Sequence, residues 1–203
     1  LASLTGWGDG RPHLASGYAY GDPVGATAGA AASLAALLHR RRTGRGQHVD
    51  LAQFDVLVAM IGEAFVEWGL TSREPQQEGN RRQGCAPHGA YPCAGDDHWV
   101  AIAVETDAQW RGLRRAMADP EWARDPVLDM ADARWARCVE LEERVSAWTR
   151  RHRKTEIFQR CVAEGVPAAP IHRMHELLED PHLHSRGFYE RVTHPGGGEW
   201  SMH

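Results

Sequence analysis

The sequence predicts an α/β fold followed by a smaller, helix-rich α+β region. Three observations support this prediction. Residues 23–43 are rich in helix formers, residues 47–52 alternate polar and apolar side chains, and residues 53–70 carry apolar residues at helical spacing. The resulting helix–strand–helix order is typical of part of an α/β fold with a parallel sheet.

The composition of the 203-residue chain excludes several classes of protein. A net charge of −4 and a pI near 6.3 give no reason to expect a nucleic-acid partner. No apolar run approaches the ~18–20 residues of a membrane span, and the N-terminus lacks the features of a signal peptide. The 4 cysteines form no CxxC pair, so we expect reduced thiols in a cytoplasmic protein.

The ends of the helix at 23–43 are clearly signalled. Asp22 and Pro23 both favour a helix start, and we predict Asp22 as the N-cap. Gly44 suits the left-handed residue that ends a helix. The basic run that begins at Arg40 puts positive charge in the last turn, where the helix dipole favours it.

The side chains in the middle of this helix are unusually small. Gly25 and Gly29 each cost roughly 1 kcal/mol relative to alanine in a helix. Their four-residue spacing indicates that another backbone or a ligand comes close. The start of such a helix also binds anions, because its free N–H groups point outward.

Two roles for Asp22 follow from these residues, and the residues alone leave both open. As a capping residue, Asp22 would contribute roughly 1 kcal/mol and no chemistry. As a carboxylate nucleophile, it would be favoured by the helix dipole, and the glycines would leave room for a bulky substrate.

The rest of the chain predicts a second domain. We place a first domain at 1–75, a polar linker at 76–90, a small α+β domain at 91–185 and a final segment at 186–203. Two strands and an Ala-Gly-Asp-Asp turn form a predicted hairpin. The other expected elements are helices with apolar faces and short extended segments. These predictions are strands at 90–92 and 98–104, helices at 107–117 (with Thr106 as N-cap), 131–151, 154–164 and 175–179, a short helix within 119–127, an extended segment at 166–172 and a strand at 188–193.

Three other groups of residues suggest chemistry but have simpler explanations. Cys85, His88 and Cys93 match no standard zinc spacing, so we predict no metal site. Large aromatic residues at helical spacing are expected in the core rather than in a ligand box. A group of histidines near the C-terminal end matches no metal-binding motif, and we assign it no chemical role. The aromatic residues are Trp110, Trp135 and Trp148, and the histidines are His172, His175, His182 and His184.

Three stretches of the chain resemble the family III CoA-transferases of the CaiB/BaiF type. They are the series at 4–12, the pair Gly21-Asp22, and the R-x-x-T-G-x-G-Q motif within 40–55. The resemblance implies that Asp22 is the position of the family nucleophile. It also implies part of a Rossmann-like large domain, a smaller α+β domain, and a return to the large domain from residue 186 onward.

The resemblance further implies a reaction and its partners. An acyl-CoA would donate CoA to a carboxylic acid through an aspartyl-CoA thioester on Asp22, a form of covalent catalysis. Gly21 and Gly25 are the candidates for CoA binding and for stabilising the oxyanion. Coenzyme A is a substrate here, so no cofactor is expected. The family forms interlocked homodimers, and no nucleic acid or membrane partner is implied.

Two alternatives stand beside the transferase interpretation. An α-methylacyl-CoA racemase would use an Asp at a similar position with a His from an earlier segment. Such enzymes tend to carry Asp-Phe-Ala-Gly-Gly, whereas Asp22 is followed by Pro-Val-Gly-Ala, as in transferases. The chain also begins at Leu1 and ends at His203 in mid-pattern, without a counterpart of the CoA-binding half. A partial chain that only folds or dimerises is therefore the second alternative.

Overall fold

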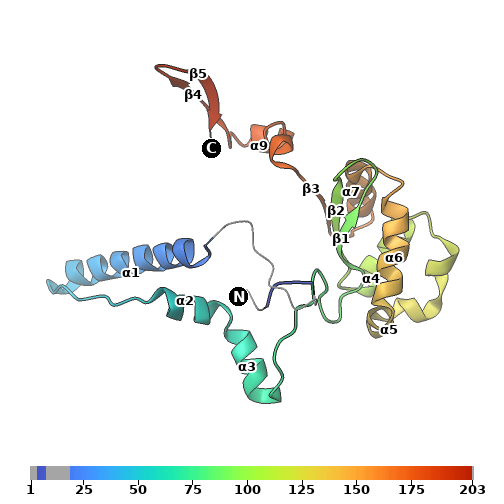
Figure 1. The fold of residues 1–203 in the computed structure, drawn as a ribbon, viewed down its shortest axis with the longest axis horizontal. Helices are drawn as coiled ribbons and strands as arrows, with labels where there is room; N and C mark the ends of the chain where they lie inside the picture. The colour runs from blue at the N-terminus through green and yellow to red at the C-terminus, as the bar shows by residue number, and fades with distance from the viewer. Residues whose placement is uncertain (1–3, 8–18, 203) are drawn as a thin grey trace. The chain divides into compact units, whose positions relative to one another are not determined.

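The computed structural model describes residues 4–7 and 19–202 (Figure 1). The chain forms two compact units, Leu1–Gly79 and Asn80–His203, which are described separately. The division falls inside the stretch at 76–90 that the sequence marks as a linker. The combination of helices with a small antiparallel sheet confirms the predicted α/β class.

The described residues of the first unit form three helices. These are α1 (Gly21–Thr43), α2 (Gln53–Met60) and α3 (Gly62–Thr71), and α1 packs against α2. The predicted end of α1 is confirmed, because Gly44 adopts a left-handed φ of 70° and its N–H donates to the Arg40 carbonyl at 2.8 Å. Arg40, Arg41 and Arg42 occupy the last turn, as the helix dipole favours.

Two predictions for the first unit are wrong. Residues 47–52 form irregular backbone rather than a strand, and their side chains are exposed. A strand is stabilised by pairing, and the described residues of this unit offer no second strand. The predicted helix at 53–70 is interrupted at Ile61, whose φ of −110° and ψ of 24° leave the helical region just before Gly62.

The second unit is built on a three-stranded antiparallel sheet. Its order is β1 (His88–Pro92), β2 (Trp99–Ala103) and β3 (Ala168–Ile171). The predicted hairpin is confirmed, although β1 begins two residues earlier than expected. The register places Tyr91 opposite Val100, and both side chains point into the core. The predicted extended segment at 166–172 supplies β3.

Helices cover the core face of this sheet. α6 (Cys138–Thr149) packs on β1, and α7 (Lys154–Ala163) packs on β2 and β3. α4 (Asp107–Ala116) packs on α7, and its predicted cap is confirmed, since Thr106 and Gln109 form a reciprocal capping box. The predicted helix at 131–151 is split at Arg137 into α5 (Ala131–Ala136) and α6.

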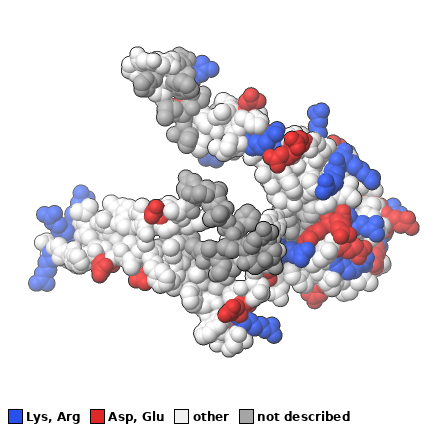
Figure 2. All heavy atoms as spheres, in the orientation of Figure 1, with Lys and Arg blue, Asp and Glu red and all other residues white. Residues whose placement is uncertain are grey.

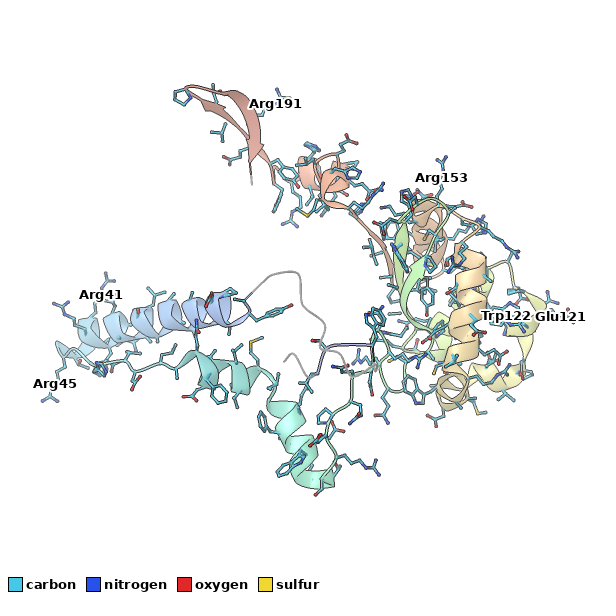
Figure 3. The ribbon with its side chains drawn as sticks, viewed as in Figure 1. Arg41, Arg45, Glu121, Trp122, Arg153 and Arg191 are labelled. Atoms are coloured by element: carbon cyan, nitrogen blue, oxygen red, sulfur yellow. The ribbon has the colours of Figure 1, made fainter. Side chains whose placement is uncertain are left out.

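The three tryptophans that the sequence places in the core are found there. Trp110 is fully buried, and its ring centroid lies 6.2 Å from that of Trp122. Trp135 and Trp148 are partly buried against the same core. Figure 3 labels Trp122 on the short 3-10 turn η1 (Glu121–Arg124), which with η2 (Pro126–Asp129) precedes α5.

The C-terminal stretch carries short elements. Asp180 caps a short helix, because its Oδ1 accepts hydrogen bonds from the N–H groups of His182 and Leu183 at 2.8 and 2.9 Å. The strand expected at 188–193 is confirmed, and it pairs with a further strand that the sequence did not indicate. The elements are α8 (Met174–Leu177), α9 (Pro181–Ser185), β4 (Glu190–His194) and β5 (Gly198–Met202). No described helix combines the length and apolarity needed to cross a membrane.

Candidate active site

Asp22 lies in the first turn of α1 and is exposed to solvent. Its predicted role as the N-cap is wrong. Tyr20 occupies that position, and the Asp22 N–H already donates to the Ala19 carbonyl at 3.0 Å. The first four N–H groups of a helix have no partner within it, so Pro23 is tolerated at the third helical position as well as at the first. The Asp22-Pro23 pair is therefore compatible with a helix that begins at Gly21, two residues before Pro23.

The Asp22 carboxylate instead contacts the next helix. Its Oδ1 accepts a hydrogen bond from Nε2 of Gln53, the first residue of α2, at 3.1 Å. The loop between α1 and α2 thus returns the chain to the start of α1. Because α1 is long, its basic last turn lies roughly 30 Å from Asp22, at 1.5 Å per residue.

Figures 2 and 3 show the basic end of α1. In Figure 2, blue atoms gather at one end of α1, and Figure 3 labels Arg41 and Arg45 there, with side chains that point away from the ribbon. Asp22 stands at the opposite end of the same helix, where the macrodipole favours an anion. The positive field acting on Asp22 within α1 therefore comes from the helix start and not from these arginines.

The two candidate glycines differ in their surroundings. Gly25 is buried, and a Cβ there would lie only 2.5 Å from Cγ of Gln53. Gly21 is half-buried, and a Cβ there would lie 3.4 Å from Gln53 Oε1 and 3.6 Å from a methyl carbon of Leu57. The close neighbour of α1 in this structure is thus the Gln53 side chain. At Gly29, by contrast, no described atom lies within 4 Å of the Cβ position.

The contact between Gln53 and Asp22 could not be predicted from the sequence. Gln53 lies 31 positions after Asp22 and begins a helix of its own, so neither spacing nor residue type links the two. The glycine at position 25 was the available signal, since it predicted a close approach to α1 without identifying the approaching group.

The remaining candidate groups carry structural roles. Burial raises the pKa of the Cys93 thiol to about 11 and that of Cys161 to about 12, so both stay protonated at neutral pH. Among the described residues, no group of three or more His, Cys, Asp or Glu side chains is arranged to hold a metal ion. His172 lies between two carboxylates, with Nδ1 4.0 Å from Glu176 and Nε2 3.8 Å from Asp180.

Comparison with known proteins identifies the family to which the chain belongs. The family model described as CoA-transferase family III matches residues 1–203. The chain belongs to CoA-transferase family III.

Curated relatives of the chain carry CoA-transferase names. A probable CoA-transferase of Mycobacterium tuberculosis is 35% identical over 174 residues, which are 86% of this chain and 22% of that protein. The succinyl-CoA–D-citramalate CoA-transferase of Chloroflexus aurantiacus is 33% identical over 202 residues, covering 100% of this chain and 50% of the relative. The chain thus spans half the length, or less, of these two relatives.

Solved structures agree with the family assignment. A CaiB/BaiF family protein from Brucella suis superposes with a TM-score of 0.81 at 27% identity, over 98% of this chain and 51% of the other. A protein of Mycobacterium tuberculosis at 21% identity shares the fold with a TM-score of 0.75, over 99% of this chain and 52% of the other. The resemblance predicted from the sequence is therefore confirmed.

Proposed function

We propose that the protein transfers coenzyme A from an acyl-CoA donor to a carboxylic acid, with Asp22 as the nucleophile. The observation that carries the proposal is an exposed carboxylate at the start of α1, next to the glycine-rich first turns, in a family III chain. The names of the curated relatives support transfer between acids rather than racemisation. The proposed chemistry uses CoA as a substrate and needs no resident cofactor.

The first half of the proposed reaction loads CoA onto the protein. An oxygen of the Asp22 carboxylate attacks the thioester carbonyl of the donor, and the carbon–sulfur bond breaks to release the CoA thiolate. The thiolate then attacks Cγ of Asp22 in the mixed anhydride, and the donor acid leaves as a carboxylate. The product is an aspartyl-CoA thioester, which divides one difficult exchange into easier steps.

The second half reverses these steps with another acid. The acceptor carboxylate attacks Cγ of Asp22, and the CoA thiolate leaves. The thiolate attacks the acyl carbon of the acceptor in the new anhydride, which forms the new thioester and frees the Asp22 carboxylate. The N–H group of Gly21, at the start of α1, is our proposed donor to the developing oxyanions. Gly25, the other glycine expected to donate, is the fifth residue of α1, so its N–H forms the first hydrogen bond within the helix, and we propose that it provides space instead.

The relatives also suggest a substrate class. Several are named for succinyl-CoA as the donor and for D-citramalate, mesaconate or L-malate as the acceptor. We therefore propose that donor and acceptor are short dicarboxylic acids. A panel that pairs succinyl-CoA with dicarboxylates and with monocarboxylates of equal length tests this choice.

We further propose that the protein acts as a homodimer in the cytoplasm. The helices α2 and α3 support the dimer, because they leave large apolar side chains exposed, among them Phe54 at 72% and Leu70 at 82%. Exposed apolar surface of this kind marks protein–protein contact. Light scattering across a range of protein concentrations reports the oligomeric state.

The substitution Asp22→Asn tests the function most simply. The amide keeps an oxygen that can accept from Gln53 but removes the nucleophile, so we expect CoA exchange to fall by at least about 10³-fold with the fold intact. Asp55→Asn is the matched control, since Asp55 is an exposed carboxylate in the first turn of α2. Exchange retained by Asp22→Asn would remove Asp22 from the mechanism, and exchange of the substrate α-proton with D₂O would favour the racemase.

A further inference from the structure

Gln53 is the one described side chain that hydrogen-bonds the candidate nucleophile. Its Nε2 donates to Asp22 Oδ1 at 3.1 Å from the first position of α2. An amide has two N–H donors and no charge. It can therefore orient a carboxylate without neutralising it, whereas a lysine or arginine would lower its nucleophilicity.

The glycine at position 25 allows this placement of Gln53. A Cβ there would lie 2.5 Å from Cγ and 3.2 Å from Nε2 of Gln53, so any other residue would displace the side chain. Gly25 lies about one turn after Asp22 on α1, on the side that packs against α2. Gly29, one turn further along, has open space at its Cβ position among the described residues. The requirement for glycine is thus specific to the turn that faces Gln53.

We infer that Gln53 positions the Asp22 carboxylate for attack and that Gly25 provides the space for it, an inference that rests on the proposed function. With Oδ1 held by the amide, Oδ2 is the oxygen left to attack the thioester. The same N–H points at the oxygen that becomes the aspartyl carbonyl once the thioester forms. Misplacement of a reacting atom by about 1 Å can cost about 10²-fold in rate.

Removal of the donor is the first test. In the intact protein, Gln53→Leu keeps a side chain of similar size but lacks the N–H. We expect kcat for CoA exchange to fall about 10- to 100-fold, while KM for the acyl-CoA changes by less than about threefold. A fall in kcat with little change in KM indicates loss of positioning, whereas a rise in KM would indicate loss of substrate binding.

A pH profile separates positioning from a merely structural role. Gln53→Glu places two carboxylates at hydrogen-bond distance, and such a pair shares a proton as the pH falls. The protonated Glu can donate to Asp22 as the amide does. We therefore expect the activity of this variant, relative to the original protein, to recover by about tenfold between about pH 8 and pH 5.

The glycines provide a matched pair of variants. Gly25→Ala displaces Gln53 and is expected to lower kcat about as much as Gln53→Leu, whereas Gly29→Ala leaves kcat unchanged. The double variant Gly25→Ala/Gln53→Leu should be no slower than either single variant, because both changes remove the same contact.

Two results would overturn the inference. One is a kcat of Gln53→Leu within about threefold of the original protein while Asp22→Asn is inactive, which leaves the proposed function standing. The other is a Gln53→Glu profile that follows the original protein's pH profile. Retained exchange in Asp22→Asn would contradict the proposed function itself, and the role of Gln53 with it.

Discussion

Lys154 shows how the second unit accommodates a buried cation. Its side chain is 7% exposed, and Nζ donates to the Ile171 carbonyl at 2.9 Å and to Glu176 Oε2 at 2.6 Å. The same carboxylate accepts the Arg173 N–H at 2.7 Å. The Lys154 ammonium, followed by this backbone N–H, lowers the pKa of Glu176 to about 2. The Lys154–Glu176 pair thus joins α7, the end of β3 and α8.

The pKa of Glu176 leads to a prediction about stability and pH. Because the folded-state pKa of about 2 lies below the ordinary value of 4.5, the stabilisation is complete above about pH 4.5 and is lost as the pH falls toward 2. Glu176→Gln should therefore lower the thermal midpoint at pH 7 by about 5 °C and have little effect near pH 2. Thermal unfolding followed by circular dichroism measures both.

Glu179→Gln is the control for this prediction, since Glu179 is an exposed carboxylate three residues further along. A destabilisation by Glu176→Gln that is equal at both pH values would show that its contribution does not depend on the charge.

The packing of α4 against α7 depends on a single glycine. A Cβ at Gly112 would lie 2.4 Å from the backbone carbonyl oxygen of Glu164 and 3.0 Å from a methyl carbon of Val166. Backbone cannot move aside as a flexible side chain can. An interior glycine destabilises the helix by roughly 1 kcal/mol relative to alanine, but here it allows α4 to approach the end of α7 closely.

Gly112→Ala is accordingly expected to destabilise the protein by about 1–3 kcal/mol, although alanine is the better helix former. Gly29→Ala on α1 is the matched control. It has open space at its Cβ position and should stabilise its helix by up to about 1 kcal/mol. Chemical denaturation measures both changes, and an unchanged or raised stability for Gly112→Ala would contradict the packing argument.

Elements with strong local signals could be predicted from the sequence. The N-cap at Thr106, the glycine that ends α1 and the β1–β2 hairpin depend on neighbouring residues, and each is confirmed. Elements that depend on distant partners could not be predicted in the same way. Residues 47–52 alternate like a strand but have no strand to pair with among the described residues of their unit.

The breaks within the predicted helices also have no local signal. Apolar spacing continues through Ile61 and Arg137, where the backbone leaves the helical region. The same distinction between local and distant signals applies to the candidate site. Asp22 could be found from its motif, but Gln53 could not, because 31 residues separate it from the side chain that it contacts.

The two units of the molecule differ in how they are stabilised. The buried hydrophobic residues of the described chain belong to Asn80–His203, whereas in the helices α1, α2 and α3 only Gly25 is buried. Figure 2 shows largely uncharged surface along these helices. The chain also covers about half of the length of three of its CoA-transferase relatives. Helices without a packed face are marginal on their own.

Hydrogen exchange of the 203-residue chain should reveal this difference. Backbone amides of β2, α4 and α7 are expected to exchange at least about 10²-fold more slowly than those of α1 and α3, because only the former lie on a packed core. Mass spectrometry of the exchanged peptides measures both sets in one sample. Equal protection in the two units would contradict this account.

Mass spectrometry of the protein after incubation with succinyl-CoA shows directly whether Asp22 carries CoA. We predict a covalent CoA adduct that peptide mapping places on Asp22, that hydroxylamine removes, and that is absent from Asp22→Asn and present in Asp55→Asn. An adduct on another residue, or continuing CoA exchange without any adduct on Asp22, would contradict the account.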